Sequence, residues 1–214
     1  MEGDPPTFSS YRYNPNNRYC LSNNAVESMY EDRKAKITNL TETAYILADN
    51  TIKEDEGGYL TLLEAQEKAK EIVKHMSYDE GNYFWINDFD AKMVMHPKKP
   101  ELDGKDLSGS QDPNGKLLFI EMAEVAKTKK SGFIDYVWDK PGSSIPQPKI
   151  SFVKAVPEWK WAIGTGIYVD DVEGAFMKEL KSIGSIMLGV ALVLGILGWF
   201  IIKSLSDPLI RIAG

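Results

Sequence analysis

Apolar positions in the first third of the chain are spaced as they are along one face of a helix. Over residues 26–51 they step by three and four, and the pattern stops before the glycine pair at 57–58. This spacing predicts one long helix of about seven turns. Thr61 and Glu64 then form a capping box, which satisfies backbone donors at a helix start, so a second helix follows. Its apolar face consists of Leu62, Ala65, Ala69, Ile72, Val73 and Met76.

The next part of the chain alternates in the manner of strands, whose successive side chains point to opposite faces. In residues 82–88 this places Tyr83 and Trp85 on one face, and Phe84 and Ile86 on the other. A turn and a second strand follow. We predict that this hairpin belongs to a sheet.

The second strand has Lys92, Val94 and His96 on a common face, and it ends at Pro97, which cannot continue a ladder. A strand that only fills a core rarely needs a histidine at one end. We therefore interpret residues 82–102 as one wall of a small-molecule pocket.

Three more strands are predicted at 132–140, 148–156 and 159–169. Short loops join them, so neighbours are expected to be antiparallel. In the first two of these strands, the side chains that share a face are Ile134, Tyr136 and Trp138, and Lys149, Ser151 and Val153, respectively.

A third helix is predicted to start at Asp112 and Pro113, a cap followed by a first-turn proline. Together these elements predict an α+β domain with a central five-stranded antiparallel sheet, a long N-terminal helix and shorter helices. A last helix is expected from Asp171. The apolar residues of the third helix are Leu117, Ile120, Met122, Ala123 and Ala126.

Residues 183–202 contain no charge. At about 1.5 Å of rise per residue, they match the roughly 30 Å hydrocarbon thickness of a bilayer. Trp199, Phe200 and Lys203 at one end suit an interfacial anchor. A buried core helix is the alternative, which the missing polar face disfavours, so we predict a transmembrane helix at 182–202. Basic residues flank it equally, which leaves its orientation open.

Composition and charge exclude several functions. The net charge of −6 argues against binding nucleic acid, which needs a basic stripe. Two histidines and one cysteine cannot build a Cys/His zinc site. The glycines of "AIGTGIY" precede no helix start, so they are no dinucleotide fingerprint, and the carboxylates of 103–112 fit no calcium loop. We therefore expect neither an enzyme nor a bound cofactor.

Residues 1–25 contain no hydrophobic run that suits a signal peptide or a membrane span. Their Pro, Asn, Ser and Tyr content is typical of a disordered tail or a non-native leader. We assign no element to this segment.

Several stretches resemble, in order, the single Cache sensor domain of bacterial transmembrane receptors such as methyl-accepting chemotaxis proteins and sensor histidine kinases. The similarity covers about residues 26–181, and "SLSDPLIRIAG" at 204–214 is similar to the start of a HAMP linker, which we place at 203–214. The family also has a first membrane helix and a signalling module after HAMP, so we expect this sequence to be a fragment or truncated product. The similar stretches are residues 82–97, 102–122, 132–142 and 148–173.

The resemblance implies a PAS-like Cache fold outside the cytoplasmic membrane, with HAMP inside. It also implies a small organic acid ligand such as acetate, propionate, pyruvate or lactate. Such an acid needs a cation or several donors for its carboxylate and an apolar wall for its chain. Lys149 and His96 are candidates for the carboxylate, and aromatic side chains for the wall. The predicted ligand-binding residues are Tyr83, Trp85, His96, Tyr136, Trp138 and Lys149.

Structural alternatives stand beside these roles. His96 suits a satisfied strand-end histidine, Lys149 a solvated strand start, and the aromatics a core. A histidine kinase sensor and a membrane-tethered binding protein without signalling output are the alternative functions. Heptad-like spacing in the long helix and small residues in the membrane segment predict a homodimer.

Overall fold

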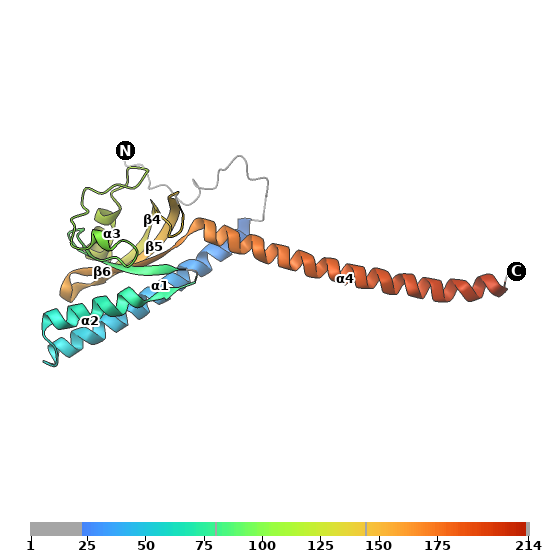
Figure 1. The fold of residues 1–214 in the computed structure, drawn as a ribbon, viewed down its shortest axis with the longest axis horizontal. Coiled ribbons are helices and arrows are strands. Elements are labelled where there is room, and N and C mark those ends of the chain that lie inside the picture. The colour runs from blue at the N-terminus through green and yellow to red at the C-terminus, as the bar shows by residue number, and fades with distance from the viewer. Residues whose placement is uncertain (1–22, 80, 144, 213–214) are drawn as a thin grey trace.

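The computed structural model describes residues 23–79, 81–143 and 145–212. They form an α+β domain from which one long helix projects (Figure 1). The predicted fold class, with its long leading helix and antiparallel sheet, is confirmed. Of the predicted leader at 1–25, residues 1–22 lie outside the described residues, and the assignment is wrong for 23–25, which belong to the first helix.

The two predicted N-terminal helices are α1 (Asn23–Glu56) and α2 (Leu62–His75), which lie side by side as a hairpin (Figure 1). The capping box at the start of α2 is confirmed: Glu64 N donates to the Thr61 hydroxyl, and Thr61 N donates to the Glu64 carboxylate. Small buried side chains let the hairpin pack closely on itself and on the sheet. They are Ala44, Ala48, Ala65 and Ala69.

The sheet is antiparallel throughout, in the order β1-β2-β6-β5-β4, with β3 paired to β2. The five predicted strands are all present, and the two-residue β1 is an addition that the sequence pattern did not indicate. β6, the last strand in the sequence, lies between β2 and β5. The strands are β1 (Ser77–Tyr78), β2 (Asn82–Asp88), β3 (Met93–Met95), β4 (Ser131–Trp138), β5 (Gln147–Val156) and β6 (Trp161–Tyr168).

The sheet separates two differently filled sides of the domain. On one side, α1 and α2 pack against Phe84 and Ile86. On the other side, α3 (Leu118–Lys129) packs against Tyr83 and Trp85. Figure 1 shows α1 and α2 below the sheet and α3 above it. The alternation predicted for β2 is therefore confirmed.

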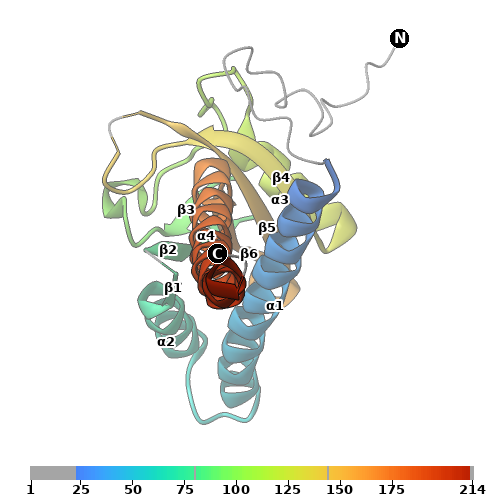
Figure 2. The same ribbon diagram turned by 90° about the vertical axis from the view of Figure 1, so that its right-hand side faces the viewer.

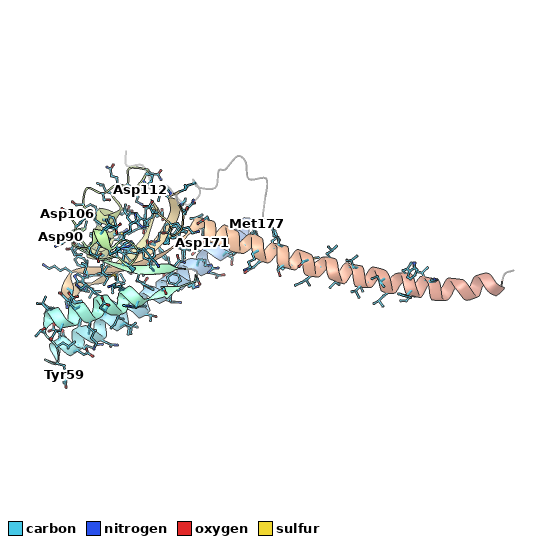
Figure 3. The ribbon with its side chains drawn as sticks, viewed as in Figure 1. Tyr59, Asp90, Asp106, Asp112, Asp171 and Met177 are labelled. Atoms are coloured by element: carbon cyan, nitrogen blue, oxygen red, sulfur yellow. The ribbon has the colours of Figure 1, made fainter. Side chains whose placement is uncertain are left out.

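The predicted start of the third helix is wrong, because Asp112 and Pro113 lie in a loop. The Asp112 carboxylate accepts backbone N–H bonds from Asn114 and Lys116, as a cap would. It also accepts the N–H of Val137 in β4 at 2.9 Å, so this residue fastens the loop to the sheet. Figure 3 shows Asp112 on the side of the domain away from α1 and α2.

The last helix, α4 (Val169–Ile212), starts directly after β6, two residues before the predicted Asp171. It is the one helix among the described residues that is long and apolar enough to cross a membrane. The side chains of 183–202 are almost all exposed, which is not the burial that a core helix would show. Figure 2 looks along α4, whose first part contacts β5, β6 and α1 before the helix leaves the domain.

Candidate functional site

A small pocket lies on the α3 side of the sheet, between β2, β4, α3 and the segment after β3. It holds about 190 Å³ of empty space, counted to its open mouth. This volume includes solvent at the mouth, so the enclosed space is smaller and suits only a ligand of few atoms. Its lining consists of Tyr83, Trp85, His96, Leu118, Phe119, Met122, Tyr136 and Trp138.

Two glycines of β6 make room for the pocket floor. Gly164 lies opposite Trp85 in the sheet, and a Cβ there would come within 2.4 Å of the indole ring. A Cβ on Gly166 would come within 2.1 Å of the Ser151 hydroxyl oxygen. The indole can therefore lie against the sheet, and Ser151 can hydrogen-bond the Tyr136 hydroxyl at 3.0 Å. The motif that fails as a nucleotide fingerprint shapes this pocket instead.

His96 lies in the pocket wall as a neutral hydrogen-bond donor. Its Nδ1 accepts the backbone N–H groups of Lys98 and Lys99 at 3.3 and 2.9 Å, which assigns the ring proton to Nε2. Burial lowers the pKa of His96 to about 3, and the charges of Lys149 and Lys99 add to the effect. Among the described residues Nε2 has no partner, so its N–H is available to a ligand.

Lys149 is buried behind the aromatic wall and is only 1% exposed. Its Nζ lies 4.2 Å from the ring centroid of Tyr83, 4.8 Å from that of Tyr168 and 5.3 Å from that of Trp85. Ring faces attract an ammonium group. However, no carboxylate of the described residues lies within 4 Å of this one. Desolvation by burial lowers the pKa of Lys149 from 10.5 to about 7.

The hydroxyl and indole groups of the wall are largely occupied within the protein. Trp85 Nε1 donates to Asn87 Oδ1 at 3.2 Å, and the hydroxyls of Tyr136 and Ser151 are bonded to each other. Burial raises the pKa of Tyr83 to about 12 and that of Tyr136 well above its usual value, so both phenols stay neutral. We therefore expect Trp85 and Tyr136 to serve mainly as walls.

The rim of the pocket is connected to the start of α4. Asp139, just after β4, forms an ion pair with Lys99, and its carbonyl accepts the Tyr168 hydroxyl at 2.8 Å. The next residue, Lys140, forms ion pairs at 2.7 and 2.6 Å with the acidic pair 170–171 in the first turn of α4. Figure 3 shows Asp171 where α4 leaves the domain. Consecutive residues 139 and 140 therefore connect Lys99 and Tyr168 with the first turn of α4.

Five of the six predicted ligand-binding residues line the pocket, and the sixth, Lys149, contacts it through the rings of Tyr83 and Trp85. The alternative in which Lys149 is a solvated strand start is wrong. The residue pairs with Tyr136 on β4 and with Tyr168 on β6, so it lies inside the sheet and is buried.

Sequence reasoning missed part of the pocket wall on α3. Because this helix begins at Leu118, its buried face is rotated from the predicted one: Leu117 and Ile120 are exposed, whereas Leu118 and Phe119 line the pocket beside Met122. Met122 was the only one of these three on the predicted apolar face. The spacing of 118, 119 and 122 was the available signal, and the early helix start concealed it.

The arrangement suits a small anion that also has an apolar part. His96 supplies a neutral donor in the lining and the other lining residues a mostly apolar wall, while Lys149 lies behind Tyr83 and Trp85 as a buried cation. No group of three or more His, Cys, Asp or Glu side chains among the described residues could hold a metal ion. A carboxylate in this pocket would supply the negative charge that Lys149 lacks.

Comparison with known proteins identifies the relatives of this chain. A family model described as a Cache domain matches residues 9–186. The chain is 36% identical over 181 residues to the methyl-accepting chemotaxis protein McpP of Pseudomonas putida, which covers 85% of this chain and 33% of that protein. It is 31% identical over 146 residues to the sensor histidine kinase MctS of Rhizobium johnstonii, covering 68% and 31%. The chain thus spans about a third of the length of these curated relatives.

Solved structures give the same picture for the fold. A structure described as the periplasmic sensor domain of a chemotaxis protein matches with a TM-score of 0.65 and 46% identity, over 66% of this chain and 98% of that one. Another, described as the structural basis for carboxylic acid recognition by a Cache chemosensory domain, matches with a TM-score of 0.64 and 36% identity, over 67% and 97%.

Proposed function

The chain belongs to the Cache domain family, and on that premise we propose that it is the sensor portion of a bacterial chemoreceptor that binds a small organic acid. The ligand class is that of acetate, propionate, pyruvate and lactate. The domain lies outside the cytoplasmic membrane, and α4 carries its signal to a HAMP linker and a cytoplasmic signalling module.

The observation that carries this proposal is the burial of Lys149 without an anion among the described residues. A buried charge is costly unless it is paired, and a carboxylate is the small ligand group that pairs with an ammonium. His96 Nε2–H offers a second contact to the carboxylate, while Phe119 and Trp138 face the rest of the ligand. The solved relative described as a carboxylic-acid-recognising Cache domain supports this ligand class.

Transmission rests on the short path from Lys149 to α4. Tyr168 touches the ammonium with its ring and is the last residue of β6, so the next residue already belongs to α4. A ligand that draws Lys149 toward the pocket changes this contact. If the domain and α4 have two arrangements, the ligand shifts the equilibrium between them only by the difference between its affinities for the two.

In this proposal α4 crosses the membrane at about 182–202, and residues 203–214 begin the HAMP linker on the cytoplasmic side. The exposed apolar side chains of the helix support the membrane assignment. Two chains pair through α1 and through the membrane helix, where Ser185 and Gly189 are small residues four apart.

Two alternatives use the same site. The similarity to MctS favours a sensor for a membrane histidine kinase, and a membrane-tethered binding protein without signalling output has the same pocket. The module that follows HAMP in the complete gene distinguishes these outputs.

A thermal-shift screen of the full chain in detergent tests the ligand class. Short monocarboxylates, dicarboxylates, amino acids and sugars are compared with sodium chloride at equal pH and ionic strength. A ligand at 100 times its Kd stabilises the folded state by about 2.7 kcal/mol. We expect a rise in Tm with one or more short monocarboxylates. No rise with any acid at millimolar concentration contradicts the proposal.

A further inference from the structure

We infer that the site takes up its acid as a carboxylate and a proton together, and that Lys149 holds this proton in the complex. The inference rests on the proposed function and adds the protonation state of the site before the ligand binds. In that state Lys149 is largely an uncharged amine above neutral pH.

The enclosure of Lys149 is the geometric basis. Its Nζ lies among the rings of Tyr83, Trp85 and Tyr168, which attract an ammonium but provide no negative charge. Water is nearly excluded, since the residue is 1% exposed. A charged group in such a place is favoured only when an anion joins it. The empty pocket therefore favours the amine, and burial accordingly lowers the pKa of Lys149 to about 7.

Groups on the neighbouring elements do not replace the missing anion. Tyr83 on β2, Tyr136 on β4 and Tyr168 on β6 are phenols whose pKa is raised by burial. His96 stays neutral, and protonating it would remove the acceptor that two backbone N–H groups share. The side of α3 that lines the pocket is apolar, and α1 and α2 cover the opposite side of the sheet.

The charged groups at the rim are already paired. Asp139 is bound to Lys99, and Lys140 is bound to the acidic pair 170–171. Asp103 accepts the backbone N–H of His96 at 2.7 Å, and neither Asp103 nor Asp139 lies within 4 Å of the Lys149 ammonium. A ligand carboxylate is left as the counter-ion for Lys149.

The binding step is a proton uptake without any change of covalent bonds in the ligand. The neutral amine of Lys149 gains a proton from solvent, and the acid enters as its carboxylate. The product is an ammonium–carboxylate pair, so the net charge inside the pocket is zero before and after binding. Because the pair stabilises the ammonium, the pKa of Lys149 rises in the complex.

Titration calorimetry of the full chain in detergent with propionate tests this step. Each pH is measured in phosphate and in Tris, whose different ionisation enthalpies reveal the number of protons taken up. With the pKa of the free site near 7, we expect little uptake at pH 6, about half a proton at pH 7 and about 0.9 at pH 8. Kd is expected to rise about fivefold from pH 7 to pH 8 and about ninefold from pH 8 to pH 9.

Other outcomes are informative. Binding without proton uptake at pH 8 overturns the inference and leaves the proposed function standing. Uptake that is largest at pH 6 and vanishes by pH 8 identifies His96 as the acceptor and also overturns it. Absence of binding by propionate and every other acid in the screen overturns the proposed function, and the inference with it.

A variant sharpens the assignment to Lys149. In Lys149→Arg the side chain is protonated at every pH used. If this variant binds propionate, its uptake at pH 8 should be zero, whereas Lys127→Arg should behave like the unmodified protein. Unchanged uptake in a binding Lys149→Arg variant overturns the inference. The proton count of the unmodified protein decides the question whether or not Lys149→Arg binds.

Discussion

The two sides of the sheet are both buried, but their buried polar groups differ in whether they have partners within the protein. On the α1 side, the buried hydroxyls of Thr41 and Thr51 donate to the carbonyls of Ile37 and Ala48 within their own helix. On the α3 side, Lys149 has no carboxylate and His96 leaves one ring nitrogen without a partner among the described residues.

Under the proposed function, this difference assigns mainly stability to the α1 side and ligand binding to the α3 side. The α1 side is complete by itself, with alanines and aliphatic side chains holding a helical hairpin against the sheet. On the α3 side, the proposed ligand would supply the anion that Lys149 lacks and an acceptor for the free His96 N–H. Substitutions on the two sides should therefore separate folding from binding.

The largest effect is expected for Phe84→Ala on the α1 side. Phe84 is 1% exposed and packs in the core beneath the helical hairpin, so its truncation should cost about 3–5 kcal/mol of unfolding free energy. Urea denaturation measures this loss. The affinity of the remaining folded protein for propionate should not change. A loss of affinity larger than the loss of stability would show that the two sides are not separable.

Lys149→Met should have the opposite effect on stability. The folded pKa, about 7, lies below the unfolded value of 10.5, so the unfolded chain binds more protons between these values. Stability of the unmodified protein therefore rises as pH rises from about 7 to 10.5, and below pH 7 it carries the full cost of the buried charge. The variant should gain up to roughly 5 kcal/mol at pH 6.

The pH dependence makes this prediction specific. The advantage of Lys149→Met should shrink between pH 7 and pH 9, measured as the difference in Tm or in urea midpoint. A constant difference across this range would mean that the lysine titrates normally. An equal change in Lys127→Met would mean that the effect is not due to burial.

Acid affinity should depend on Lys149 and not on a surface lysine. Removing the cation in Lys149→Ala loses a charge-assisted bond of about 1.5–3 kcal/mol, which is roughly tenfold or more in Kd. Lys127 forms an exposed ion pair with Asp90, so Lys127→Ala should leave Kd unchanged. Calorimetric titration with propionate makes the comparison. Equal affinities would remove Lys149 from the site.

Gly164→Ala should damage the pocket through Trp85. The added methyl collides with the indole ring, which must move. This displacement should cost about 1–3 kcal/mol of stability and weaken the binding of propionate. Gly109→Ala is the matched control, because a Cβ there meets nothing within 4 Å. Intrinsic tryptophan fluorescence should shift in the first variant only. Identical affinity in both variants would contradict a role for the Trp85 position.

The smallest effect is expected at the capping box of α2. Thr61→Ala removes the hydroxyl that accepts the Glu64 N–H, at a cost of about 1 kcal/mol. Thermal unfolding detects this loss, and affinity for propionate should be unchanged. A clear change in affinity would show that the helical hairpin influences the pocket.

Much of the pocket could be predicted because strand alternation leaves little choice. Because side chains alternate between the faces of a strand, Tyr83 and Trp85 must both lie on the face of β2 that is buried against α3. The same rule placed Tyr136 and Trp138 on the matching face of β4. The short loops predicted the antiparallel pairing of consecutive strands, but not the position of β6 between β2 and β5.

What could not be predicted depends on contacts between distant parts of the chain. A lysine after a proline-rich loop is usually exposed, and the burial of Lys149 comes from Tyr83 and Tyr168 on two other strands. Asp112 looks like a helix cap, but its second oxygen is bound by Val137, 25 residues away. No local pattern contains that partner, so the start of α3 and its two pocket residues were missed.

The enclosure of Lys149 determines which chemical quantity the receptor would measure. An amine that must gain a proton to hold a carboxylate makes occupancy depend on two concentrations multiplied together. Above pH 7, the product of carboxylate and hydrogen ion is proportional to the concentration of undissociated acid. That form crosses bilayers most readily, since charge is costly in hydrocarbon. The occupancy of such a site would follow the concentration of the membrane-permeant, undissociated acid rather than the total acid concentration.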